Sequence, residues 1–149
     1  MSAQQTTEPA TTKPRVFCAD DNPLVTDALK GYITRSREFQ WMGCAENADD
    51  LCRAVEVQGC PEIVLLDIDM PGMSPFDAVR KLASCCPHAR VLMYSGMVRR
   101  DLIDHAIEAG AWGYVSKSDG EQALFWAMHA VLRDEVAFSP EVAGLVTEL

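Results

Sequence analysis

The chain has 149 residues, a length typical of a single domain that can fold without a metal ion or a disulfide. Hydrophobic residues make up 48% of the chain and charged residues 23%, the balance of an ordinary globular protein. The formal net charge of −9 argues against a nucleic-acid-binding face, which needs clustered Lys and Arg. No apolar run approaches the roughly 18 residues of a membrane span.

The start of the chain is polar and rich in Thr, Pro and Gln, which predicts a disordered tail over residues 1–14. It does not have the pattern of a signal peptide. We therefore expect a cytoplasmic protein without a membrane partner.

Six cysteines are scattered along the chain, without a CxxC pair and without a Cys/His cluster of zinc spacing. In a reducing cytoplasm they are predicted to be free thiols. Cys18, Cys44 and Cys60 have apolar neighbours and are expected to be buried. A redox role for the vicinal pair Cys85-Cys86 is the alternative.

From Arg15 onward, short apolar runs alternate with helical patterns. Strands are predicted over 15–19, 39–46, 62–66, 89–95 and 112–116, and helices over 21–36, 48–59, 74–86, 98–110 and 118–135. A strand followed by a helix, five times over, predicts a doubly wound (βα)5 α/β fold. Its five-stranded parallel sheet would carry helices on both faces.

The predicted helix starts carry capping residues. Asn22 and Ser74 each precede a proline, the usual order of an N-cap and a first helical residue. Ser118 and Glu121 have the S-x-x-E spacing of a capping box, which places the start of the last helix at Ser118.

Polar side chains lie at the carboxyl ends of four of the predicted strands. Asp20-Asp21 follow the first strand, Asp67 the third, Ser95 ends the fourth and Lys117 follows the fifth. In open α/β sheets, ligands bind beyond the carboxyl ends of the strands. We therefore expect three carboxylates, one hydroxyl and one ammonium group to converge at one edge.

Three converging carboxylates repel one another and need compensation. A hard divalent cation with oxygen ligands is the natural compensator, which predicts a Mg²⁺ site. Lys117 and Ser95 beside such a site are suited to stabilising a transferring phosphoryl group. Asp67 would be the nucleophile, as in aspartyl-phosphate chemistry.

The chain resembles a response-regulator receiver domain with the CheY-like fold. The motifs that carry the resemblance are "ADDNPLV" (19–25), "LLDIDMPGM" (65–73), "YSG" (94–96) and "GAWGYVSK" (110–117). The resemblance covers about residues 15–135.

The resemblance implies a role for each matching residue. Asp67 matches the phosphoacceptor, Asp20 and Asp21 match the Mg²⁺-holding acidic pair, and Asp69 matches the position whose backbone carbonyl binds the metal. Ser95 matches the switch hydroxyl, Tyr114 the switch aromatic that turns inward, and Lys117 the lysine that contacts the phosphoryl group. A sensor histidine kinase is the implied partner and phosphoryl donor.

Residues 136–149, and the "GAWGYVSK" wording, resemble the NarL/FixJ type. There a linker helix leads to a helix-turn-helix domain, which we expect to be absent here because the chain stops at Leu149. Homodimerisation is an open expectation, and DNA contact is expected only through the output domain. The alternative is a stand-alone receiver that acts by protein contact or as a phosphorelay intermediate.

An enzyme alternative rests on "VLLDIDM", which resembles the aspartate motif of haloacid-dehalogenase-type phosphatases. Three features argue against it: Met70 follows the second Asp where that family prefers Thr or Val, the motif falls on the third strand, and an acidic pair follows the first. A nucleotide site is not indicated, since no strand leads into a glycine-rich phosphate loop. We expect no enzyme beyond catalysis of its own phosphorylation and dephosphorylation.

Overall fold

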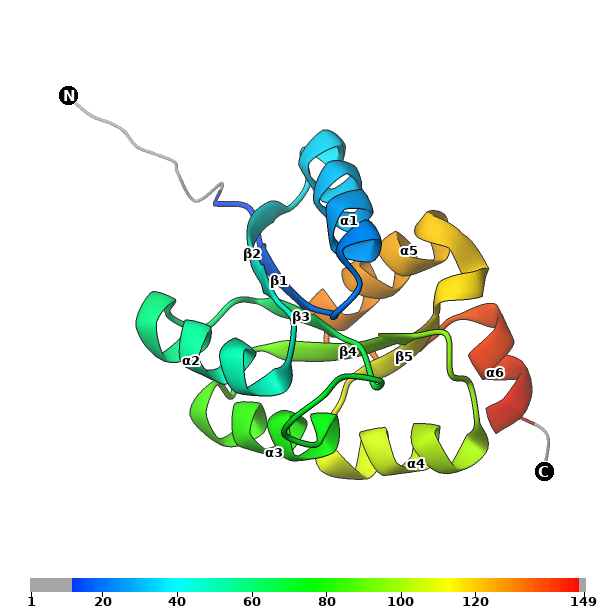
Figure 1. Cartoon of the computed structure of the whole chain (residues 1–149). Helices are drawn as coiled ribbons and strands as arrows, with labels where there is room; N and C mark the ends of the chain where they lie inside the picture. The colour runs from blue at the N-terminus through cyan, green and yellow to red at the C-terminus, as the bar shows by residue number, and fades with distance from the viewer. Residues whose placement is uncertain (1–11, 148–149) are drawn as a thin grey trace.

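The computed structural model describes residues 12–147, which form one parallel sheet between two layers of helices (Figure 1). The strand order is β2-β1-β3-β4-β5-β6. The strands are β1 (Arg15–Ala19), β2 (Gln40–Ala45), β3 (Ile63–Leu66), β4 (Arg90–Ser95), β5 (Gly113–Ser116) and β6 (Ala137–Phe138). The predicted doubly wound (βα)5 fold is confirmed, with all five predicted strands in place.

A sixth strand extends the predicted five-stranded sheet. β6 has two residues and pairs in parallel with β5, Ala137 opposite Gly113 and Phe138 opposite Tyr114. A Cβ atom at Gly113 would meet the Ala137 carbonyl oxygen at 2.1 Å, so this close pairing depends on the glycine. Two residues give no alternating pattern, which is why the sequence did not predict this strand.

Helices cover both faces of the sheet. The helices are α1 (Pro23–Ser36), α2 (Ala48–Gln58), α3 (Pro75–Cys85), α4 (Arg100–Ala109), α5 (Gly120–Leu132) and α6 (Pro140–Val146). Buried side chains of α1 and α5 form one core cluster with the sheet, and those of α2, α3 and α4 form the other. Within residues 12–147, no helix is both long and apolar enough to cross a membrane.

The central strand explains the uninterrupted apolar run in the sequence. All four residues of β3 are 0% exposed, because helices cover both faces and β1 and β4 pair with its two edges. Such a strand is hydrophobic at every position rather than at alternate ones.

Most of the predicted helix ends are confirmed. Asn22 Oδ1 accepts a hydrogen bond from the Leu24 N–H at 3.0 Å, and Ser74 Oγ accepts one from the Phe76 N–H at 3.2 Å. The capping box is wrong. Residues 117–119 form a 3-10 turn, α5 begins at Gly120, and the Ser118 N–H donates to Ser116 Oγ at 3.1 Å.

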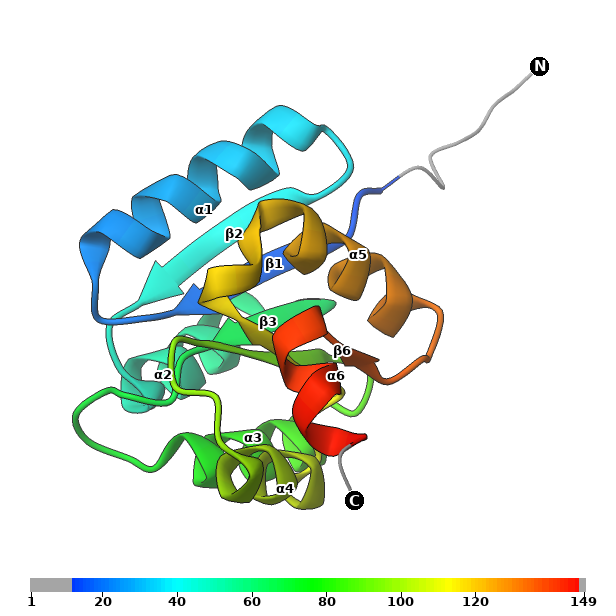
Figure 2. The same ribbon diagram turned by 90° about the vertical axis from the view of Figure 1, so that its right-hand side faces the viewer.

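The C-terminal segment folds back onto the domain. Figure 2 shows α6 in front of β6, between α4 and α5. Val142 on α6 is fully buried in the same core cluster as Tyr114 on β5. A helix in this segment was expected. The division into a tail, a receiver and a linker stays a prediction, and most of the tail lies outside the described residues.

The expectation of free cysteines is wrong for two of the six. Cys60 and Cys86 form a disulfide across 26 positions of sequence. The fold brings Cys60, just before β3, beside the end of α3, with the two Cα atoms 5.7 Å apart, a separation that a disulfide readily spans. Cys44 is exposed rather than buried, because β2 is an edge strand. Cys18 is buried as expected.

Candidate functional site

Two buried carboxylates stand side by side at the ends of neighbouring strands. Asp20 follows β1 and Asp67 follows β3, and these strands pair so that Ala19 lies opposite Leu66. The Asp67 N–H donates to the Ala19 carbonyl at 2.9 Å, and the Asp20 N–H donates to the Ala45 carbonyl at 3.0 Å. Backbone hydrogen bonds therefore fix both residues before their side chains make any contact.

The predicted convergence of charged side chains is present. One carboxylate oxygen each from Asp20, Asp21 and Asp67, together called the acidic cluster here, lie within 4.8 Å of one another. Asp20 is 2% exposed and Asp67 6%, whereas Asp21 is exposed. Lys117 Nζ lies 2.7 Å from Asp20 Oδ2 and 3.6 Å from Asp67 Oδ2.

The electrostatics of the site follow from burial and crowding. Burial, and then repulsion from Asp20, raise the pKa of the Asp67 carboxyl, and Lys117 only partly offsets them. Burial alone would lower the pKa of Lys117, but its hydrogen bond to Asp20 and its attraction to both carboxylates raise it. The lysine is thus held in its charged form.

The residues present fit a divalent cation. Three carboxylates and one ammonium group leave a formal charge of −2 on these four side chains, equal and opposite to that of Mg²⁺. Carboxylate oxygens are the ligand type that Mg²⁺ prefers, and the exposed Asp21 leaves one side open to the waters that Mg²⁺ usually keeps. Asp20, Asp21 and Asp67 would hold it.

Ser95 and Tyr114 lie on β4 and β5, the next two strands on one side of β3. Ser95 ends β4, is fully buried, and its Oγ accepts a hydrogen bond from the Met97 N–H at 3.0 Å. Tyr114 on β5 is also fully buried, and its hydroxyl donates to the Met97 carbonyl. Burial raises the pKa of the Tyr114 hydroxyl to about 12. The tyrosine is therefore already turned inward, beneath the loop that follows Ser95.

The loop after Asp67 is held by a residue that the sequence did not single out. Asp49, in the first turn of α2, accepts a hydrogen bond from the Met73 N–H through Oδ2 at 3.1 Å. Gly72 beside it has a φ of +90°, and a Cβ atom there would come within 2.7 Å of the same oxygen. Asp69 is exposed in this loop. The metal role of its carbonyl stays a prediction.

A second group of unforeseen residues connects the site to the C-terminal segment. Ser116, which precedes Lys117, donates through its N–H to Ser139 Oγ at 2.9 Å and through its hydroxyl to Glu141 Oε1 at 2.5 Å. Asp119 Oδ2 accepts from the Glu141 N–H at 2.9 Å. The sequence showed these residues only as a short polar stretch and a helix start, so no pattern indicated their contact.

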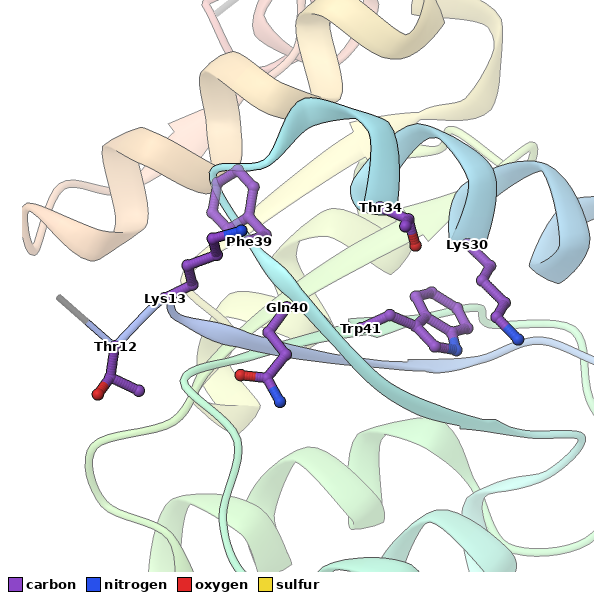
Figure 3. A pocket seen from close by; sticks show the side chains of 7 residues that line it. All are labelled: Thr12, Lys13, Lys30, Thr34, Phe39, Gln40 and Trp41. Carbon is purple, nitrogen blue, oxygen red and sulfur yellow. The ribbon is translucent and has the colours of Figure 1, made fainter.

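Two cavities differ in whether a predicted site residue lines them. One of about 710 Å³ is at the amino end of β2 and the second half of α1 (Figure 3), lined by Thr12, Lys13, Lys30, Thr34, Phe39, Gln40 and Trp41. None of the predicted site residues lines it. A smaller one of about 280 Å³ is lined by Lys117, which pairs with Asp20, and otherwise by α1 and Tyr94.

The family model of the response regulator receiver domain matches residues 16–129. This chain belongs to the response regulator receiver family. The match includes the acidic cluster, Ser95, Tyr114 and Lys117 in one continuous stretch. It leaves no place for the phosphatase alternative, whose aspartate motif would follow the first strand.

Individual receivers agree with this assignment. The chain is 28% identical over 134 residues to the uncharacterized transcriptional regulatory protein YxjL of Bacillus subtilis, covering 90% of this chain and 61% of YxjL. It is 33% identical over 132 residues to the transcriptional regulatory protein MctR of Rhizobium johnstonii, covering 87% of this chain and 60% of MctR. The chain thus spans about three fifths of the length of these relatives.

A solved structure extends the likeness to three dimensions. The two-component response regulator of the LuxR family from Aurantimonas sp. superposes with a TM-score of 0.85 at 29% identity. The superposition covers 92% of this chain and 97% of that one. The resemblance to NarL-type and LuxR-type receivers is therefore confirmed.

Proposed function

We propose that this receiver takes a phosphoryl group on Asp67 from a sensor histidine kinase and thereby switches its conformation. An oxygen of the Asp67 carboxylate attacks the phosphorus of a phosphohistidine. The bond between phosphorus and the histidine nitrogen breaks as the new oxygen–phosphorus bond forms, and the electron pair stays with the nitrogen. The observation that carries the proposal is a buried carboxylate with both a lysine and two further acids around it.

The chain's own residues prepare this transfer. Backbone hydrogen bonds hold Asp67 at the end of β3, and Lys117 Nζ, 3.6 Å away, is within reach of an incoming phosphoryl oxygen. Ser95 ends the neighbouring strand β4 and can offer its hydroxyl to the same group if the loop after β4 moves toward it. A Mg²⁺ ion held by Asp20, Asp21 and Asp67 would neutralise charge on the transferring group.

The switch would travel along β5. When Lys117 moves from Asp20 toward the phosphoryl group, Ser116 moves with it, and Ser116 is hydrogen-bonded to Ser139 and Glu141. The position of α6 would then depend on the state of Asp67, as a shift between two populations. A Ser95 that turns toward the phosphoryl group would release the Met97 loop above Tyr114.

We infer that the output is control of transcription through a DNA-binding domain, in a cytoplasmic setting. The relatives YxjL and MctR are named as transcriptional regulatory proteins and are longer than this chain. The net charge of −9 supports a proposal in which DNA contact falls to another domain. Homodimerisation through the face that carries α6 is one way in which the switch could be read.

The test is intact-protein mass after incubation with acetyl phosphate, with and without Mg²⁺. We expect a Mg²⁺-dependent gain of one phosphoryl group in the wild type and none in Asp67→Asn. Asp69→Asn is the matched control, because it removes an exposed acid two residues away and keeps its backbone carbonyl. An equal gain in Asp67→Asn, or no gain in the wild type from either acetyl phosphate or a phosphorylated kinase, would refute the proposal.

A further inference from the structure

Three sulfur atoms meet at the far end of α3 from the acidic cluster. Cys60 and Cys86 are bonded to each other. The Sγ of Cys85, the last residue of α3, lies 3.8 Å from the Sγ of Cys86, close to van der Waals contact. Cys60 Sγ lies 3.7 Å from the Cys85 carbonyl oxygen, so all three residues pack as one group.

The three cysteines differ in their access to solvent. Cys86 is 1% exposed, so a reagent in solution cannot approach its sulfur directly. Cys60 is partly buried, and Cys85 is exposed and free. Thiol–disulfide exchange requires a thiolate to approach a disulfide sulfur atom. Cys85 is the thiol that the fold has placed beside the buried sulfur.

We propose that Cys60, Cys85 and Cys86 form a thiol–disulfide exchange site whose substrate is a reducing dithiol. This inference is independent of the proposed phosphoryl transfer.

The exchange proceeds in two balanced stages. Cys85 loses its proton and its thiolate attacks Cys86 Sγ. The Cys60–Cys86 bond breaks, and the electron pair goes to Cys60, which takes up a proton. No net oxidation occurs. The external dithiol then attacks the exposed Cys85 sulfur and releases Cys86. Its second thiol releases Cys85, and the dithiol leaves as a disulfide, having given up two electrons.

The intermediate is a disulfide between neighbours in sequence. Consecutive Cα atoms are about 3.8 Å apart. Unstrained disulfides span about 4.4–6.8 Å between Cα atoms. The vicinal bond is therefore strained and easily reduced, and without a reductant the exchange returns to Cys60–Cys86. Because the intermediate exposes the Cys85 sulfur, a dithiol can reduce the Cys60–Cys86 disulfide without reaching the buried Cys86 sulfur itself.

The segment between the two disulfide cysteines indicates which part of the protein the exchange would affect. Residues 60–86 contain β3, Asp67, the loop after it and α3. The disulfide ties the two ends of this segment together at the end of the sheet opposite to the acidic cluster. Reduction would free those ends, so the redox state of the surroundings would act on the segment that carries Asp67.

The test follows reduction of the oxidised full chain by dithiothreitol, quenched at intervals with acid and N-ethylmaleimide. Trypsin releases Cys60 in peptide 54–80 and Cys85 with Cys86 in peptide 82–90. The oxidised protein gives these two peptides linked. The exchange intermediate gives peptide 82–90 with an internal disulfide and peptide 54–80 alkylated at Cys60.

We expect Cys85→Ser to slow the loss of the linked pair by more than about tenfold. Cys44→Ser, which removes an exposed cysteine from β2, should leave the rate unchanged. The internal disulfide of peptide 82–90 should appear transiently in the wild type. Reduction of Cys85→Ser at the wild-type rate would mean that the dithiol attacks Cys60 directly. That result, or an oxidised wild type without the linked pair, would overturn the proposal.

Discussion

The two ends of the sheet differ in how their charged side chains are balanced. At the amino end of β1 and β3, Arg15 and Glu62 form an ion pair at 2.9 Å, and Arg15 Nη2 also donates to the Cys60 carbonyl at 2.6 Å. At the carboxyl end, three carboxylates share one lysine. At the amino end, the charges of Arg15 and Glu62 neutralise each other. At the carboxyl end, the ionised acidic cluster and Lys117 become neutral when a divalent cation binds.

This difference in charge balance suggests that the amino end of the sheet serves stability and the carboxyl end serves function. A paired charge of each sign holds the strands together whatever the solution contains. An excess of buried negative charge costs stability and is relieved by a ligand that neutralises it. Variants that alter the charge at either end should therefore respond differently to Mg²⁺.

The largest effect is expected from Lys117→Met. It leaves Asp20, whose side chain is 1% exposed, without its cation, and breaking a buried pair in this way costs about 3–5 kcal/mol. Because Lys117 itself is partly exposed, we expect about 2–3 kcal/mol in Mg²⁺-free buffer. Saturating Mg²⁺ should recover most of this loss, measured by urea denaturation.

Arg15→Met is the matched variant at the other end. Its pair with Glu62 is partly exposed, so we expect a loss of about 1 kcal/mol that Mg²⁺ does not change. Equal responses of the two variants to Mg²⁺ would show that the ends do not differ as described.

An effect between those of Lys117→Met and Arg15→Met is expected from Gly72→Ala, which tests how the loop after Asp67 is held. The residue has a φ of +90°, and the added Cβ would meet Asp49 Oδ2 at 2.7 Å. We expect a loss of about 1–2 kcal/mol together with slower phosphoryl uptake. Gly144→Ala is the control, because nothing lies within 4 Å of its Cβ position. It should be neutral or stabilising by up to about 1 kcal/mol.

The smallest effect is a stabilisation by Asp67→Asn. The pKa of Asp67 is raised above its usual 3.8 by burial and by Asp20, so its ionised form weakens the fold at neutral pH. Without Mg²⁺, the variant should be more stable at pH 7 by on the order of 1 kcal/mol. A raised pKa favours the protonated fold, so the gap to wild type should close as the pH falls through that pKa. A gap that widens in acid, in thermal melts, would contradict this assignment.

The sequence predicted what depends on single strands and their ends. β3 is covered on both faces and so is apolar throughout, and the parallel order brings Asp20, Asp67 and Lys117 to one edge without further information. These features follow from local pattern and topology alone.

The sequence did not predict contacts that depend on how distant segments meet. Cys60 and Cys86 are brought together by the packing of α3, and Asp49 reaches Met73 only through the placement of α2. The capping box at Ser118 failed because Ser116 accepts the Ser118 N–H and a 3-10 turn forms first. A local motif was outweighed there by a neighbouring hydroxyl that the motif does not include.

The central claim is that the acidic cluster at the carboxyl ends of the strands binds a divalent cation. Its most direct test is calorimetric titration of Mg²⁺ into protein stripped of divalent ions. We predict one ion bound per chain in the wild type and in Arg15→Met. In Asp20→Asn and Asp67→Asn the affinity should fall by more than about tenfold. Unchanged affinity in both aspartate variants, or no binding by the wild type, would contradict the account.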